Sequence, residues 1–159
     1  MEIRAIYPES LENRLNTRRL AHPNLELIFM KVDLVIVDDS KIWLSIAKKL
    51  AENHPLVQHV TTFEDSMDAW VYLQTSHANV LMTDIEMPSM NGLSFITMFG
   101  RKLPVISSST KASFAPHAME LGSSNFLPKP FSKKDFDYTI QYVHQNLIRS
   151  PHPQKPVTK

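Results

Sequence analysis

Residues 80–92 read VLMTDIEMPSMNG, and this stretch determines how the rest of the chain is organised. It begins as a short apolar run, reaches the carboxylate of Asp84, and continues through two turn-forming pairs, Met87-Pro88 and Asn91-Gly92. An apolar run bounded by turn residues is typical of a buried strand, so we expect Asp84 at the carboxyl end of that strand. In open α/β sheets this edge is where ligands bind. Asp84 alone is ambiguous, because an Asp at this place also caps helices.

A second apolar run ends in carboxylates and removes much of this ambiguity. Residues 33–40 read DLVIVDDS, so Asp38 and Asp39 follow another short apolar segment. Two such strands in one parallel sheet bring three carboxylates to the same edge, where their repulsion raises a pKa or requires a cation. Carboxylate oxygens suit Mg²⁺, which binds through one or two carboxylates, a phosphate and several waters. The pattern therefore predicts a Mg²⁺-assisted phosphoryl-transfer site with one Asp as acceptor.

Length and composition limit the alternatives. The chain has 159 residues, which suits one domain with a substantial core. A net charge of +1 gives no reason to expect a nucleic-acid partner. The absence of cysteine excludes disulfides and thiolate chemistry and is compatible with a reducing cytoplasm. No apolar run approaches the ~20 residues of a membrane span. We therefore expect a cytoplasmic domain without membrane contact.

The two ends of the chain do not follow the pattern of its centre. Residues 1–30 show only a thin apolar spacing, and Met30 lies just before the first predicted strand. This extension is interpreted either as an arm or as the result of a misassigned start codon, with the second favoured. Residues 150–159 carry three prolines and are expected to be disordered. The domain itself is expected to occupy residues 31–149.

Apolar runs and helical stripes alternate along this central region. Five alternating strand and helix units predict a parallel sheet that is covered on both faces. The predicted strands are 33–37, 57–61, 79–83, 104–108 and 125–129. The predicted helices are 40–52, 64–74, 92–100, one that ends at Leu121-Gly122, and one that opens at Ser132. Their predicted buried residues are Ile42, Ile46 and Leu50 in the first helix, Ala69, Trp70 and Leu73 in the second, and Phe136, Ile140, Val143 and Leu147 in the last.

Three local signals make these assignments testable. Pro128 lies inside the fifth predicted strand, and proline is tolerated there only at the edge of a sheet. Pro116 lies in the fourth helical pattern, so that helix should start or kink near it. Ser132 and Asp135 have the spacing of a capping box, which marks the start of the last helix.

Together these positions resemble the receiver domain of two-component response regulators, the CheY-like superfamily. The likeness covers about residues 31–148 and rests on matches to Asp38-Asp39, Asp84, Ser109 and Lys129 in the family's order. The resemblance implies a doubly wound, flavodoxin-like α/β fold, with a five-stranded parallel sheet in the order 2-1-3-4-5 and helices on both faces. In this order the fifth strand lies at an edge, as its proline requires.

The resemblance assigns a role to each matching residue. Asp84 is the phospho-acceptor, followed by the family's Met-Pro and Asn-Gly pairs. Lys129 is a point-charge partner of the phosphoryl group, since a lysine ammonium binds phosphate in this way. The implied cofactor is Mg²⁺, bound by Asp38, Asp39, Asp84 and the backbone carbonyl of Glu86.

Further residues are implied to control the switch. Ser109 donates its hydroxyl to the phosphoryl group, and Phe126 is the switch aromatic, where the family often has Tyr. Glu86 and Lys111 flank the path of water to the acyl phosphate. Their opposite charges predict a salt bridge across that path and a comparatively long-lived phosphorylated form. The resemblance also implies a cis Lys129-Pro130 bond. Because Pro116 favours the first turn of a helix, residues 110–115 are expected to form a loop that is mobile without phosphate.

The implied partners are proteins. A sensor histidine kinase or phosphotransfer protein would phosphorylate the chain, and a downstream protein target would bind the changed surface. That surface is expected on the helix ending at Leu121-Gly122, strand 125–129 and the helix from Ser132, and a homodimer through it is a further possibility. No direct nucleic-acid binding is expected from what resembles a stand-alone receiver. The flanks of Ser109 and Leu121-Gly122 are also similar to receivers that precede LytTR domains.

Two other functions stay open. A haloacid-dehalogenase-like phosphohydrolase also uses an Asp and Mg²⁺, but it needs Asp-x-Asp after its first strand, where this chain has adjacent Asp38-Asp39. A constitutive adaptor would not turn over phosphate, and the complete acidic site argues against it. The chain is not expected to be an enzyme beyond self-phosphorylation and autodephosphorylation. Its seven histidines lack ligand spacing and are expected at the surface or boundary.

Overall fold

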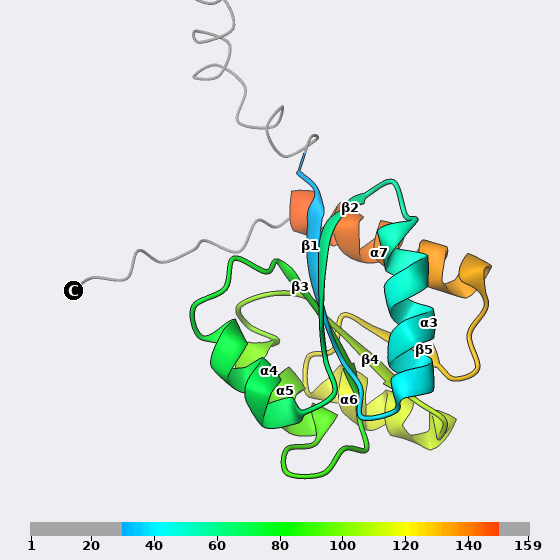
Figure 1. Ribbon diagram of the computed structural model, residues 1–159. Helices are drawn as coiled ribbons and strands as arrows, with labels where there is room; N and C mark the ends of the chain where they lie inside the picture. The colour runs from blue at the N-terminus through cyan, green and yellow to red at the C-terminus, as the bar shows by residue number, and fades with distance from the viewer. Residues whose placement is uncertain (1–29, 150–159) are drawn as a thin grey trace, which may run out of the picture. The chain divides into compact units, whose positions relative to one another are not determined.

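The computed structural model describes residues 30–149 (Figure 1). The predictions for the N-terminal extension before residue 30 and for the tail at 150–159 lie outside this range. Chain contacts separate a unit that begins at Lys31, and the fold described below belongs to it. Within the described range, no helix combines the length and apolar character needed to cross a membrane.

The centre of the fold is a parallel sheet in the order β2-β1-β3-β4-β5, which confirms the predicted fold class. Helices α3 and α7 cover one face, and α4, α5 and α6 cover the other (Figure 1). The strands are β1 (Val32–Val37), β2 (Val57–Phe63), β3 (Val80–Asp84), β4 (Val105–Ser109) and β5 (Asn125–Pro128). The helices are α3 (Lys41–Glu52), α4 (Ser66–Leu73), α5 (Gly92–Phe99), α6 (Ala115–Glu120) and α7 (Lys133–Arg149), with a 3₁₀ turn η1 (Ala112–Phe114) before α6.

The central strands are buried on both faces. Side chains alternate between the two faces of a strand, so β1 sends Val35 and Val37 into the core cluster that also contains Phe95 of α5. The alternate residues of β1, Leu34 and Ile36, point to the opposite face and are equally buried. Strands covered on both faces carry continuous apolar runs, which explains why these segments were recognisable without alternation.

The buried face of α3 differs from the prediction. Ile42 is 72% exposed and Ile46 is 37% exposed, whereas Leu44, Ala47 and Ala51 are buried. Both sets have helical spacing, and a helix turns about 100° per residue, so residues two positions apart lie on nearly opposite sides. Periodicity alone therefore does not choose between them. In the fold Leu44 and the two alanines are buried, and the isoleucines are exposed.

The other helix stripes are closer to their predictions. In α7 all four predicted residues, Phe136, Ile140, Val143 and Leu147, are buried. In α4 two of the three are buried, Ala69 and Leu73, while Trp70 is partly buried and packs against the core.

The local signals were correct at the prolines and at the last helix. β5 lies at the edge of the sheet, which accommodates Pro128. Pro116 lies in the first turn of α6, where its missing N–H costs nothing. The Ser132 hydroxyl accepts from the Asp135 N–H at 3.1 Å, and the Asp135 carboxylate accepts from the Ser132 N–H at 2.9 Å. This reciprocal pair is the predicted capping box.

Two histidines contradict the prediction that they lie at the surface or boundary. His54 is 4% exposed and His144 is 7% exposed, while His59, His77 and His117 are exposed as expected. The His54 Nδ1 accepts from the Leu56 N–H at 3.1 Å, so this ring nitrogen has a hydrogen-bond partner two residues away in the chain. Burial lowers the pKa of His54 and favours its neutral form.

Candidate functional site

Three carboxylates meet at the carboxyl edge of the sheet. β1 and β3 are adjacent, and Val37 pairs with Thr83, so the residues that follow them lie side by side. Oxygen atoms of Asp38, Asp39 and Asp84 all lie within 4.8 Å of one another. Asp38 and Asp84 are 4% and 8% exposed, so two of these charges are largely removed from water. The parallel register thus produces an acidic cluster from residues 45 positions apart in the chain.

Lys129 connects two of these carboxylates. Its Nζ donates to Asp38 Oδ2 at 2.6 Å and to Asp84 Oδ1 at 3.0 Å. The lysine follows β5, where its backbone N–H donates to the Ser109 carbonyl at 2.9 Å. The Lys129-Pro130 peptide bond is cis, as the sequence resemblance implied. The ammonium of Lys129 is therefore held inside the acidic cluster, at a side-chain exposure of 4%.

The charges in the cluster are not balanced. Burial raises the pKa of Asp84 to about 6, and repulsion from Asp38 and Asp39 adds to this, although the Lys129 ammonium opposes it. One ammonium among three carboxylates leaves room for a further positive charge. Closely grouped carboxylate oxygens are the hard ligands that Mg²⁺ prefers. The donor set and its excess negative charge therefore fit a divalent cation of this kind.

A tight turn after Asp84 brings the chain back over the end of β3. The Gly92 N–H donates to the Ile85 carbonyl at 2.8 Å, and Asn91 caps α5 by accepting from the Ser94 N–H at 3.0 Å. A Cβ atom at Gly92 would lie 2.2 Å from the Asp84 carbonyl oxygen, far inside van der Waals contact. Only glycine permits this approach, which places the loop that carries Glu86 beside the acidic cluster.

The same loop is held from α4 by a residue that the sequence analysis missed. Buried Ser66 donates its hydroxyl to the Pro88 carbonyl at 3.0 Å and accepts from the Met90 N–H at 3.1 Å. Between these two contacts Ser89 has a φ of 65°, and the Met90 N–H also bonds the Pro88 carbonyl at 2.8 Å. This is a strained γ-turn. Nothing in the local sequence links Ser66 to a loop 22 residues later.

An ion pair joins the loops after β3 and β4. The Lys111 Nζ lies 2.6 Å from Glu86 Oε1, and both side chains are exposed. The Lys111 backbone N–H also donates to the Ser109 hydroxyl at 3.0 Å. The predicted partners are thus in contact.

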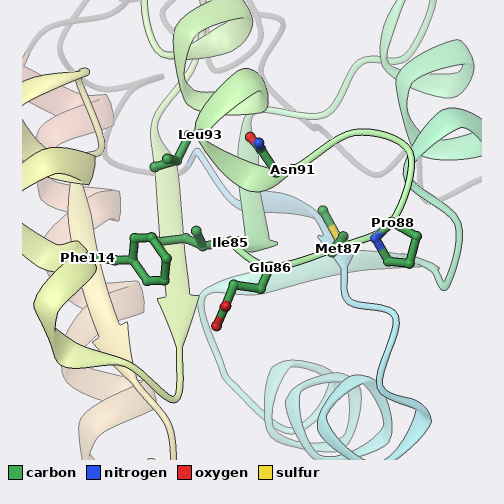
Figure 2. Close-up of a pocket in the computed structure, with 7 residues that line it drawn as sticks. All are labelled: Ile85, Glu86, Met87, Pro88, Asn91, Leu93 and Phe114. Carbon is green, nitrogen blue, oxygen red and sulfur yellow. The ribbon is translucent and has the colours of Figure 1, made fainter.

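Beside this ion pair lies a small pocket of about 260 Å³. Figure 2 shows Phe114 of η1 facing Ile85 across it. The pocket separates the loop after Asp84 from the segment before α6, and its lining residues are Ile85, Glu86, Met87, Pro88, Asn91, Leu93 and Phe114.

The structure places the remaining predicted residues at the same end of the sheet. Ser109 is the last residue of β4, and its neighbour Ser108 pairs with Asp84. Ser109 itself is 1% exposed. Phe126 lies in β5, half-buried, and packs against the core cluster beneath α4, α5 and α6.

Trp43 is a second residue that the sequence analysis missed. The Lys129 Nζ lies 5.5 Å from the centroid of the Trp43 ring, within the range of a cation–π contact. Trp43 lies one turn before Ala47, at the border of the buried face of α3. The only available signal was an aromatic residue in the first turn after the acidic pair.

A family model and curated relatives match most of this chain. A family model described as the response regulator receiver domain matches residues 34–141. A protein-glutamate methylesterase/protein-glutamine glutaminase from Hydrogenovibrio crunogenus is 30% identical over 135 residues, covering 81% of this chain and 35% of the relative. A similarly named protein from Burkholderia thailandensis is 32% identical over 127 residues, covering 76% of this chain and 35% of the relative. The chain thus spans about a third of the length of these curated relatives.

Solved structures show the same fold. The response regulatory domain of mrkE from Klebsiella pneumoniae superposes with a TM-score of 0.69 at 20% identity, covering 75% of this chain and all of that one. The chemotaxis response regulator CheY4 of Vibrio cholerae gives a TM-score of 0.64 at 22% identity, covering 71% of this chain and 98% of that one. At these identities the structural matches establish the architecture.

Proposed function

Because this chain belongs to the response regulator receiver domain family, we propose that it is a phospho-acceptor switch in which Asp84 receives a phosphoryl group. Receiver domains act in two-component signal transduction as phospho-acceptors rather than as enzymes. The observation that carries the proposal is the buried contact of Lys129 with both Asp38 and Asp84, inside a cluster of three carboxylates. The proposed receiver comprises residues 31–149.

The proposed reaction is a phosphoryl transfer from a phosphohistidine of a kinase or phosphotransfer protein. An Asp84 carboxylate oxygen attacks phosphorus, a P–O bond forms, and the P–N bond to the donor breaks with its electron pair returning to the histidine ring. Catalysis of such transfers is mostly positioning and charge neutralisation. Lys129 would neutralise the phosphoryl oxygens, and Ser109 would donate its hydroxyl to them. Bound Mg²⁺ would supply further positive charge, held by Asp38, Asp39, Asp84 and the Glu86 backbone carbonyl.

Phosphorylation would then change the surface formed by α6, β5 and α7. In the proposed switch Ser109 turns toward the phosphoryl group and Phe126 follows. Support comes from large apolar side chains exposed on both helices: Met119 is 46% exposed on α6, and Tyr138 and Tyr142 are 66% and 41% exposed on α7. Exposed apolar groups of this kind suit a protein partner, either a downstream target or a second copy of the chain.

Incubation with acetyl phosphate and Mg²⁺, followed by intact mass, tests the proposal. Wild type should gain one phosphoryl group, and Asp84→Asn should gain none. Asp39→Ala should lose both Mg²⁺ binding by calorimetry and phosphorylation. Asp68→Asn, which removes an exposed carboxylate on α4, is the matched control and should behave as wild type. Uptake by Asp84→Asn would contradict the assignment, and no uptake by wild type would favour a constitutive adaptor.

We further propose that the Glu86–Lys111 pair slows hydrolysis of the phosphorylated form. An exposed ion pair contributes only ~0–1 kcal/mol to stability, so its effect would be steric and would act on the attacking water. Phosphorylated Glu86→Ala and Lys111→Ala should both lose phosphate faster than wild type. Lys48→Ala breaks a remote exposed ion pair and is the control. Unchanged or slower decay in both variants would show that the pair does not control water access.

A further inference from the structure

The ammonium of Lys129 has aromatic as well as acidic neighbours. Two carboxylates contact its Nζ, and the Trp43 ring lies 5.5 Å from the same atom. The Trp43 ring lies 5.4 Å from that of Phe131, and Phe131 lies 6.3 Å from buried Phe136. A row of rings thus runs from the core under α7 to the lysine. Figure 1 shows α3, which carries the tryptophan, on the same face of the sheet as α7.

We propose that Trp43 is a positioning residue, whose indole holds the Lys129 ammonium in place between Asp38 and Asp84. This inference rests on the proposed function, because the lysine's role is to meet the phosphoryl group. It adds a residue from the first turn of α3 to the reaction, and this residue contributes no oxygen ligand and no reacting atom.

Two physical features support a positioning role. A lysine side chain is a flexible four-carbon stem with many rotamers, so its location must be imposed by its surroundings. A cation–π contact strengthens when the cation is removed from water, and the Lys129 side chain is only 4% exposed. The aromatic ring also occupies space that the stem would otherwise sample.

Core packing alone does not account for the position of this residue. The buried face of α3 is formed by Leu44, Ala47 and Ala51, and Trp43, one turn before Ala47, lies at the border of this face and is half-buried. Its ring packs against that of Phe131 and lies within cation–π range of the Lys129 ammonium. The indole therefore lies at the edge of the core, where it contacts both buried Phe131 and the lysine.

The test compares Trp43→Leu, which removes the π-face, with Trp43→Phe, which keeps one. At saturating Mg²⁺, the rate of phosphorylation by acetyl phosphate should fall roughly 3- to 30-fold in Trp43→Leu, the range of a cation–π contact. Trp43→Phe should recover most of this loss. Trp70→Leu removes a partly buried indole from α4 and should leave the rate unchanged.

Mg²⁺ affinity separates positioning from a general loss of structure. The Mg²⁺ dissociation constant of Trp43→Leu should equal that of wild type or be lower, because a displaced ammonium no longer repels the ion. A parallel loss of rate and Mg²⁺ affinity would show that the indole merely supports the end of β1, and would overturn the proposal. In a Lys129→Ala background, Trp43→Leu should have no further effect on the rate, and a further loss would contradict the coupling.

An NMR measurement keeps the test independent of phosphorylation. In wild type, the ring current should shift the Lys129 ε-methylene protons upfield, and Trp43→Leu should remove this shift. Absence of the shift in wild type would overturn the inference even if phosphorylation proceeds normally. If wild type takes up no phosphoryl group but shows the shift, the proposed function fails while the placement of the lysine by the indole stands.

Discussion

Replacing Asp84 with Asn should make the domain more stable in the absence of Mg²⁺. The folded protein holds this carboxylate in a buried site beside Asp38 and Asp39, and the unfolded chain does not. Asn removes the charge, keeps nearly the same shape, and still offers an oxygen to the Lys129 ammonium. The side chain proposed as phospho-acceptor is thus predicted to destabilise the fold.

The magnitude follows from the pKa. Burial raises the pKa of Asp84 from 3.8 to about 6, a difference that corresponds to about 3 kcal/mol. Because the folded pKa lies above the unfolded value, the folded state binds more protons between these limits, and stability falls as the pH rises through them. The destabilisation by the ionised Asp84 carboxylate is absent well below pH 3.8. It reaches about half its full value near pH 5 and is complete above about pH 6.

Urea unfolding in the presence of a chelator measures this effect. At pH 8 the free energy of unfolding of Asp84→Asn should exceed that of wild type by about 3 kcal/mol, and at pH 5 by about half as much. At pH 8 the higher stability should raise the melting temperature by roughly 10 °C. Mg²⁺ at ten times its dissociation constant should stabilise wild type by about 1.4 kcal/mol. This would reduce the difference in stability between Asp84→Asn and wild type.

Two results would refute this reasoning. Equal stability of Asp84→Asn and wild type at pH 8 would show that the buried charge costs nothing. A stability difference of the same size at pH 5 and pH 8 would show that its origin is packing and not ionisation. Asp68→Asn on α4 removes an exposed carboxylate and serves as the control, with no comparable gain expected.

Three further substitutions test the surroundings of the site by urea unfolding. Gly92→Ala should lower stability by about 1 to 3 kcal/mol, since its Cβ would lie 2.2 Å from the Asp84 carbonyl oxygen; wild-type stability would disprove this close approach. Ser89→Gly should raise stability by up to about 1 kcal/mol, because its φ of 65° is strained for a residue with a Cβ, and a clear loss would show that the turn is not strained. Phe136→Ala should cost about 3 to 5 kcal/mol, as the ring is fully buried, and a cost under ~1 kcal/mol would contradict its place in the core.

The sequence by itself determined the elements whose signals are local. Residues of β1 and β3 form continuous apolar runs because parallel strands are buried on both faces, and the carboxylates at their ends could be located from this alone. The stripe of α7 was equally clear, because Phe136, Ile140, Val143 and Leu147 share one face of the helix and all are buried. Pro128 required an edge strand, since it lacks the N–H that a central strand must donate.

Tertiary structure decided which of two possible faces α3 buries. Its sequence holds one stripe with Ile42 and Ile46 and another with Leu44, Ala47 and Ala51. Hydrophobicity favoured the isoleucines, but the side chains that the fold buries are Leu44 and the two alanines. The choice depends on how the whole helix is placed against the sheet, which no local pattern records.

Tertiary structure also decided which residues support the site from a distance. Ser66 of α4 hydrogen-bonds the loop after Asp84, and Trp43 contacts the ammonium of Lys129, 86 positions later in the chain. The burial of His54 is a further example, since its Nε2 lies 3.9 Å from Asp137 Oδ1 of α7, a helix much later in the chain. Such contacts depend on the relative placement of whole elements. A periodic pattern reports only how one element divides its side chains between core and solvent, so these partners became visible only in the folded chain.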